Sequence, residues 1–238
     1  MKISILTLFP EMFESVFNTS IIKRAIDNNL VDIECINIRD FTNDKHSHVD
    51  DTPFGGGKGM LIQCQPVLDA LSIIRTKDSH VILMSPVGIK FNQKYARKFS
   101  NYKHLIIICG HYEGIDARVY KYVDELVSIG DYILTGGELG AMVISDAIIR
   151  LQTGVIEEES HQDESFENGL LEYPQYTKPQ DYNGDLVPEV LLSGHHENIR
   201  KYRLKESLRL TKNNRPDLLI GRAFTDEELA LLDEIENE

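Results

Sequence analysis

Four glycine clusters are the features of this 238-residue sequence best suited to binding a ligand. Because glycine has no side chain, backbone N–H and C=O groups beside it can approach a bound molecule closely. None of the clusters has the GxGxxG spacing of dinucleotide-binding loops or the GxxxxGK[ST] spacing of phosphate-binding loops. The sequence therefore predicts either a small-molecule site of another kind or ordinary turns at residues 55–59, 85–88, 110–114 and 130–138.

One polar loop carries residue types that could bind a metal ion. His46, His48, Asp50 and Asp51 lie close together in it, and histidine with aspartate is a common ligand combination. Such a grouping on a flexible loop is seldom a metal site. We predict no metal site formed by protein side chains here.

The first 150 residues predict an α/β layer with a mostly parallel sheet, because strand and helix patterns alternate. Strand patterns occur at residues 3–8, 31–38, 81–84, 104–109 and 124–129. Helical patterns occur at residues 12–26, 66–74, 91–99 and 139–151. Ligands of such sheets bind at the carboxyl ends of the strands. We therefore expect residues 85–88, 110–114 and 129–137 to form one small-molecule site.

The composition changes near residue 155. Residues 157–189 hold ten acids and one base, with prolines and glycines but no clear periodicity, which is typical of a linker. Helical patterns then occupy residues 196–211, 215–221 and 225–236, and Thr225 with Glu228 predicts a capping box. The predicted organisation is an α/β domain at 1–156, an acidic linker at 157–189 and a helical domain at 190–238.

The net charge of −13 argues against a protein that coats nucleic acid by bulk attraction. The acid is confined mainly to residues 157–189 and 224–238. Residues 196–222 contain eight bases and three acids, which indicates either a phosphate-contacting surface or a solvated helix. Cys35, Cys64 and Cys109 form no CxxC pair, and no apolar run is long enough to span a membrane. We therefore predict a cytoplasmic protein.

Eight short motifs follow one another along nearly the whole chain. They occur at residues 8–13 (LFPEMF), 39–41 (RDF), 49–51 (VDD), 53–60 (PFGGGKGM), 109–116 (CGHYEGID), 128–139 (SIGDYILTGGEL), 169–174 (GLLEYP) and 190–194 (VLLSG). Together they resemble the bacterial tRNA (guanine-N1)-methyltransferases of the SPOUT class. A ninth motif, RPDLL at residues 215–219, extends the similarity toward the end of the chain.

This resemblance implies an activity and a fold. Family members transfer the methyl group of S-adenosylmethionine to N1 of guanine 37 in tRNA, next to the anticodon, which maintains the reading frame. The implied fold is an α/β SPOUT-type parallel sheet with a deep C-terminal trefoil knot, followed by a small all-helical C-terminal domain. Knots are rare exceptions to ordinary topology. The implied assembly is a homodimer with its active site between subunits.

The resemblance also implies binding residues. The methyl donor would contact Leu83, Met84, Ser85, Pro86, Val87, Gly88, Gly110, Tyr112, Glu113, Ile129, Gly130, Asp131, Tyr132, Ile133, Leu134, Gly136, Gly137 and Gly140. The tRNA would contact Asp50, Asp51, Gly55, Gly56, Gly57, Arg200, Arg203, Arg209 and Arg215. Mg²⁺ is associated with the family, so Glu113 and tRNA phosphates are its candidate ligands. Gly140 stands where the family usually has proline, so this side of the donor pocket is expected to be looser.

The reaction needs a general base for the N1 proton and a cation for the charge that moves to O6. Arg150 aligns with the family arginine assigned to that oxygen, although a structural pair with Asp146 would explain it as well. The family has an aspartate directly before Ser-Phe. Strict register places Glu164 there, and a one-residue shift places Asp163 there, so either is the candidate base unless both are solvated linker charge.

Three other functions compete with this interpretation. A non-catalytic RNA-binding relative would not need the intact donor loops. A SPOUT-like methyltransferase with another RNA target would not need the helical C-terminal domain or the loop at 53–60. A nucleotide-dependent dehydrogenase would need the missing GxGxxG motif.

Overall fold

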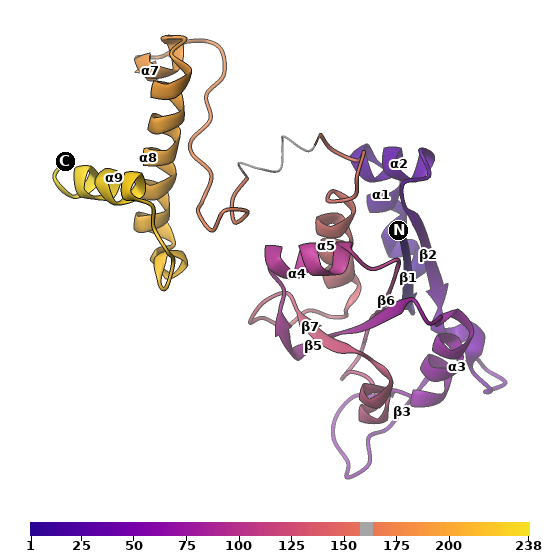
Figure 1. Cartoon of the computed structure of the whole chain (residues 1–238). Coiled ribbons are helices and arrows are strands. Elements are labelled where there is room, and N and C mark those ends of the chain that lie inside the picture. Colours follow the sequence, from indigo (N-terminus) through magenta and orange to yellow (C-terminus); the bar gives the residue numbers. More distant parts are fainter. Residues whose placement is uncertain (158–163) are drawn as a thin grey trace. The chain divides into compact units, whose positions relative to one another are not determined.

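The computed structural model describes residues 1–157 and 164–238 (Figure 1). The chain forms two compact units, Met1–Ile156 and Glu157–Glu238, which are described one at a time. Whether residues 157–189 act as a separate linker stays a prediction. Within the described ranges, no helix is both long and apolar enough to cross a membrane.

The first unit contains a five-stranded parallel sheet in the order β2-β1-β6-β5-β7, which confirms the predicted α/β fold. Its strands are β1 (Lys2–Thr7), β2 (Asp32–Asn37), β5 (Ser79–Lys90), β6 (His104–Ile108) and β7 (Glu125–Ser128). A small antiparallel pair is formed by β3 (Asp50–Asp51) and β4 (Leu61–Ile62). The helical elements are η1 (Pro10–Phe13), α1 (Glu14–Phe17), α2 (Ser20–Asp27), η2 (Ile38–Phe41), α3 (Cys64–Ile74), α4 (Gln93–Ser100), η3 (Ala117–Tyr122) and α5 (Glu138–Ile149).

Hydrophobic cores cover both faces of this sheet. Leu105 and Ile107 of β6 belong to one core, together with residues of α2, α4 and α5. Ile106 and Ile108 belong to the other core, together with residues of α3 and η3. A strand buried on both faces is expected to be a continuous apolar run. This explains the uninterrupted apolar run at residues 105–108 of β6.

Strand β5 extends well beyond the predicted residues 81–84. It pairs with β7 through Met84, is interrupted at residues 85–88, and pairs again when Ile89 meets Val127. Gly88 makes this second pairing possible, since a Cβ there would lie 2.3 Å from the backbone nitrogen of Val127. The apolar pattern stops at the interruption, so the second half of the strand had no signal in the sequence.

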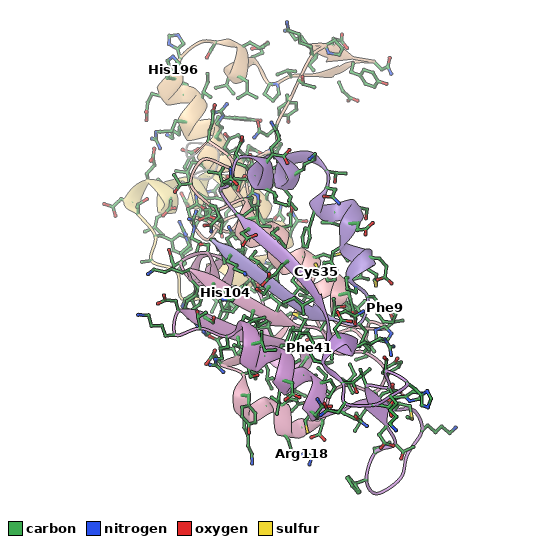
Figure 2. All side chains as sticks on the ribbon, turned by 90° about the vertical axis from the view of Figure 1, so that its right-hand side faces the viewer. Phe9, Cys35, Phe41, His104, Arg118 and His196 are labelled. Atoms are coloured by element: carbon green, nitrogen blue, oxygen red, sulfur yellow. The ribbon has the colours of Figure 1, made fainter. Side chains whose placement is uncertain are left out.

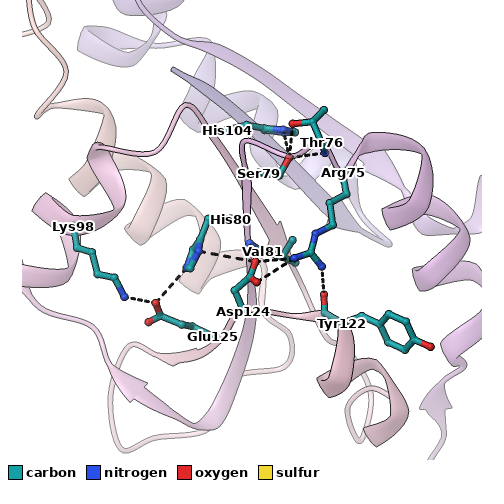
Figure 3. A network of polar contacts seen from close by, with 10 residues as sticks. All are labelled: Arg75, Thr76, Ser79, His80, Val81, Lys98, His104, Tyr122, Asp124 and Glu125. Carbon is teal, nitrogen blue, oxygen red and sulfur yellow. Dashed lines mark hydrogen bonds and ion pairs between the residues drawn. The ribbon is translucent and has the colours of Figure 1, made fainter.

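A polar network lies at the end of the sheet where β5 and β6 begin, and Figure 3 draws Ser79 and His104 of it. Ser4 and Ser79 hydroxyls each lie 2.8 Å from one ring nitrogen of His104. Because Ser4 donates its proton to Glu34 at 2.6 Å, Nε2 of His104 must donate to Ser4 and Nδ1 must accept from Ser79. The neutral imidazole is therefore fully hydrogen-bonded, and burial lowers the pKa of His104. In Figure 2, His104 marks this end of the sheet and Phe9 marks the other.

The second unit consists mainly of helices. Among its described residues, 157 and 164–238, the helices are α7 (Glu189–Leu192), α8 (His196–Asn214), η4 (Pro216–Leu219) and α9 (Asp226–Glu236), with a hairpin of β8 (Asp181–Tyr182) and β9 (Asp185–Leu186). Leu170, Leu208 and Leu231 form its buried core. The capping box of Thr225 and Glu228 is confirmed at the start of α9. The helix predicted at 215–221 is a single 3-10 turn, because Pro216 lacks an N–H group and begins a new element.

Candidate active site

A cleft of about 440 Å³ lies at the carboxyl ends of β5, β6 and β7, the three neighbouring strands at one side of the sheet. Residues of the glycine clusters after β6 and β7 line it, together with residues of the 85–88 interruption within β5. Sixteen of the residues predicted to bind the methyl donor are in its walls: Leu83, Met84, Ser85, Pro86, Val87, Gly110, Tyr112, Glu113, Ile129, Gly130, Tyr132, Ile133, Leu134, Gly136, Gly137 and Gly140. The structure therefore brings together residues that are up to 57 positions apart in the sequence.

Two residues of the same predicted set do not line the cleft. Gly88 is pressed against the backbone of β7. Asp131 is exposed, and its carboxylate accepts a hydrogen bond from the Lys90 ammonium at 3.0 Å. Both residues shape the surrounding loops.

The loops after β6 and β7 hold each other in place. The N–H of Gly137 donates to the carbonyl of Gly110 at 2.7 Å, and His111 pairs with Gly136 through a backbone bridge. A Cβ at Gly137 would lie 2.9 Å from both Cα of Cys109 and Cβ of Met84. Glycine at 137 is therefore required by close backbone approach, whichever ligand the cleft binds.

A buried acid, Glu138, lies behind the cleft and was absent from the predicted site. It begins α5, accepts a hydrogen bond from the Thr7 hydroxyl at 2.9 Å, and lies 3.5 Å from Nδ1 of His111. Burial, with a smaller contribution from the charge of Glu138, raises the pKa of the Cys109 thiol well above its usual value, so Cys109 is a packed thiol and no nucleophile. His111 and Thr135, which also line the cleft, had a signal in the sequence because both lie within the glycine motifs.

The loop at residues 53–60 borders the cleft. Gly59 leaves room for Glu113, since a Cβ at Gly59 would lie 2.4–2.8 Å from its side chain. The N–H of Glu113 donates to the carbonyl of Met60 at 3.0 Å. The predicted substrate residues Gly55, Gly56 and Gly57 lie farther along this loop, and Asp50 and Asp51 form β3 just before it.

The His-x-His sequence is held by Asp44. One oxygen of Asp44 accepts hydrogen bonds from the backbone N–H groups of His46 at 2.8 Å and His48 at 3.1 Å, and lies 2.9 Å from Nδ1 of His48. These hydrogen bonds lower the pKa of Asp44. Within residues 1–157 and 164–238, no group of three or more His, Cys, Asp or Glu side chains is placed to hold a metal ion.

None of the three predicted catalytic residues lies in the part of the first unit that lines the cleft. Arg150 follows the last residue of α5, whose first residue borders the cleft. The helix has 12 residues, so about 18 Å separate its two ends. Glu164 belongs to the second unit, and Asp163 lies outside the described residues.

The four predicted tRNA-binding arginines of the second unit differ in their partners. Arg200 pairs with Glu197 and Glu227, Arg209 pairs with Glu206 and Glu238, and Arg215 pairs with Asp217. The guanidinium of Arg203 instead lies over the ring of Tyr173, 4.8 Å from its centroid.

The parallel sheet and its glycine-lined cleft define an α/β protein with a cleft at the carboxyl ends of its strands, where sheets of this kind bind ligands. Comparison with known families is more specific. The profile of the tRNA (guanine-1)-methyltransferase TrmD family matches residues 1–221, so the chain belongs to that family.

Individual relatives are similar in sequence to this chain over nearly their full lengths. The tRNA (guanine-N(1)-)-methyltransferase of Clostridium botulinum is 56% identical over 236 residues, which cover 98% of each chain. That of Clostridium beijerinckii is 54% identical over 234 residues, again 98% of each chain. That of Dictyoglomus turgidum is 52% identical over 239 residues, covering 100% of this chain and 98% of the relative.

Proposed function

We propose that this chain transfers the methyl group of S-adenosylmethionine to N1 of guanine 37 in tRNA, in the cytoplasm. The main observation that supports this proposal is the cleft. In a chain that belongs to the tRNA (guanine-1)-methyltransferase family, three glycine loops converge on one site at the carboxyl ends of β5, β6 and β7.

The cleft suits S-adenosylmethionine in size and chemistry. Its volume of about 440 Å³ lies within the usual range for small-molecule sites, about 300–1,000 Å³. Leu83, Ile129 and Leu134 supply apolar walls for an adenine ring, and Glu113 supplies negative charge for a cationic donor. The bound donor would provide an electrophilic methyl group on its sulfonium.

The chain's own residues must prepare the guanine. N1 carries a proton at neutral pH, so a carboxylate has to remove it while N1 attacks the methyl carbon. We assign that role to Glu164 or Asp163, which therefore gains the N1 proton. The Arg150 guanidinium then holds the negative charge that moves onto O6.

We further propose that the active enzyme is a homodimer with its site between subunits. Arg150 and the cleft lie at opposite ends of α5 in one chain, so a second copy is needed to bring an Arg150 to a donor-filled cleft. Leu139 and Val143 support this proposal. They lie four residues apart on α5, hence on one face, and are 48% and 51% exposed.

We also propose that the first unit contains the deep trefoil knot of the SPOUT class. The contact between the loops after β6 and β7 supports this proposal. Asp50, Asp51 and the glycines at 55–57 are proposed to contact the target nucleotide beside the cleft. Arg200, Arg203, Arg209 and Arg215 are proposed to contact tRNA phosphates. If Mg²⁺ takes part, Glu113 and tRNA phosphates are its proposed ligands.

Product analysis tests the reaction directly. Full-length protein is incubated with S-adenosylmethionine and a tRNA transcript that has guanine at position 37, and the RNA is digested to nucleosides for mass spectrometry. We expect N1-methylguanosine and no other methylated guanosine. A different methylated nucleoside would favour a SPOUT-like enzyme with another target, and no methylated nucleoside would favour a non-catalytic relative.

A further inference from the structure

The second unit contains a groove of which the proposed function uses only Arg203. The extended segment before α7 runs beside α8 (Figure 1), and together they enclose about 520 Å³. Tyr173, Pro174 and Tyr176 come from the extended segment, while Ile199 and Arg203 come from α8. Since Ile199 and Arg203 are four residues apart, they lie on the same face of the helix.

The charge of this groove is opposite to that of its surroundings. Residues 157–238 carry 20 acidic and 9 basic side chains, a net charge of −11. The twelve described residues that line the groove include Lys178 and Arg203 but no acid. A strongly acidic unit therefore presents one aromatic groove whose charged groups are all cations.

Acids of the chain's end neutralise the bases on another face of α8. Glu227 pairs with Arg200, and Glu236 pairs with Lys212, at 2.6 and 2.7 Å. Lys205 pairs with Glu234 at 2.8 Å. In the described ranges, Arg203 pairs with no carboxylate. Its cation is therefore available to an anionic ligand.

An unstacked nucleotide combines the groups that such a groove recognises. Tyrosine rings and guanidinium planes stack on exposed bases, and arginine and lysine pair with phosphates. A peptide ligand would have to be apolar and acidic at once to use the same surface. The aromatic rings of Tyr173 and Tyr176, set beside the cations of Arg203 and Lys178, favour RNA.

We propose that this groove binds an unstacked nucleotide of the tRNA, distinct from the guanine that is methylated. The proposal rests on the proposed function, because it takes tRNA as the partner. The nucleotide's base lies against Tyr173 and Tyr176, and its phosphate pairs with Arg203 and Lys178.

Two variants and two matched controls test it in the full-length protein. Tyr176→Ala and Arg203→Ala remove groove residues. Tyr182→Ala removes another exposed tyrosine from the same unit, and Lys212→Met removes another cation from α8. Binding of a tRNA transcript is measured by fluorescence anisotropy, and methyl transfer is measured at saturating tRNA.

We expect Tyr176→Ala and Arg203→Ala to raise the Kd for tRNA at least fivefold, since loss of one base–aromatic stack costs about 1–3 kcal/mol. The kcat of Tyr176→Ala at saturating tRNA stays within twofold of wild type, and the controls change Kd less than twofold. Transcripts containing 4-thiouridine are expected to photo-crosslink to peptides from residues 173–178 or 199–203 of the wild type.

Unchanged tRNA affinity in both groove variants, with no crosslink to these peptides, would overturn the proposal. So would variants that weaken self-association of the protein in sedimentation experiments while leaving the tRNA Kd unchanged, because the groove would then be a protein interface. Absence of methyl transfer by the wild type, by contrast, would count against the proposed function and not against the groove.

Discussion

The hydroxyl of Thr7 donates a hydrogen bond to the carboxyl group of Glu138 at 2.9 Å, across 131 positions of sequence. Thr7 ends β1, and Glu138 begins α5 and faces His111 of the loop after β6. One buried side chain therefore joins a central strand, the main helix and a wall of the cleft. Glu138 is placed to fix the shape of the cleft without lining it.

Glu138→Ala should loosen the cleft. The substitution leaves the buried Thr7 hydroxyl without its acceptor, which costs about 1–3 kcal/mol of stability. We expect a matching fall in the free energy of unfolding measured with urea, and weaker binding of S-adenosylmethionine in calorimetric titration. Glu138→Gln keeps an acceptor for Thr7 and should lie closer to wild type. Equal, near-wild-type behaviour of both variants would contradict the assigned role.

Gly88→Ala should destabilise the sheet. The added methyl group would lie 2.3–2.5 Å from backbone atoms of Leu126 and Val127, which strand pairing holds in place. We expect a loss of about 3 kcal/mol, at the upper end of overpacking costs. Gly110→Ala is the matched control, because its methyl group would meet Ile115 at an ordinary 3.5 Å. Urea unfolding that shows similar losses for both variants would rule out this explanation.

Local patterns were sufficient to predict the parallel sheet and the end of it where the cleft lies. The run at residues 105–108 identified a doubly buried strand, and the glycine clusters marked loops at its carboxyl edge. Contacts distant in sequence were not predictable in this way. The second half of β5 depends on its partner β7 and has no local signal. Glu138 lies within the motif at 128–139, but its burial and its hydrogen bond with Thr7 depend on a contact 131 positions away.

The same limit applied to the basic segment at 196–222. Its eight bases were counted along the sequence, but the structure shows that acids of α9 pair with several of them. Helical spacing could place Ile199 and Arg203 on one face. It could not show that Tyr173 lies beside them, because that tyrosine comes from an aperiodic segment.

Stability should fall as the pH drops below 6.5. Burial lowers the pKa of His104 below its usual 6.5, and burial likewise lowers that of His80. Between the two pKa values the unfolded chain therefore binds protons that the folded chain does not. The contribution of these histidines to the free energy of unfolding is fully present above pH 6.5 and is lost as the pH falls toward the folded pKa values.

His104→Gln isolates part of this effect, because glutamine can still bond both serines but does not titrate in this range. We expect its unfolding free energy to vary less between pH 7 and about pH 5.5 than that of the wild type. If the unfolding free energies of the two proteins change equally with pH, His104 does not contribute to the pH dependence of stability.

Removal of the candidate base should slow methyl transfer with tRNA still bound. Loss of a general base typically reduces the rate about 10²–10⁴-fold, and we expect such a fall in kcat for Glu164→Gln or for Asp163→Asn. Glu157→Gln, an exposed acid nearby, is the control and should keep the wild-type rate. Near-normal turnover by both variants would exclude these carboxylates as the base.

Arg150→Ala should reduce kcat about 10²–10³-fold, the usual cost of losing one oxyanion-stabilising group. Because the proposed dimer combines Arg150 of one chain with the cleft of the other, mixing offers a second measurement. Arg150→Ala and a cleft-defective variant, each inactive alone, should together regain part of the activity. If both variants are folded and exchange subunits but the mixture regains no methyl transfer, the site is not shared between two chains.

Methyl transfer to position 37 tests the central claim most directly. The full-length protein is given methyl-labelled S-adenosylmethionine and either a transcript with guanine at position 37 or the same transcript with adenine there. We predict label in the first RNA only, at N1 of that guanine. Equal labelling of the two transcripts, or no label in either, would contradict the proposed function.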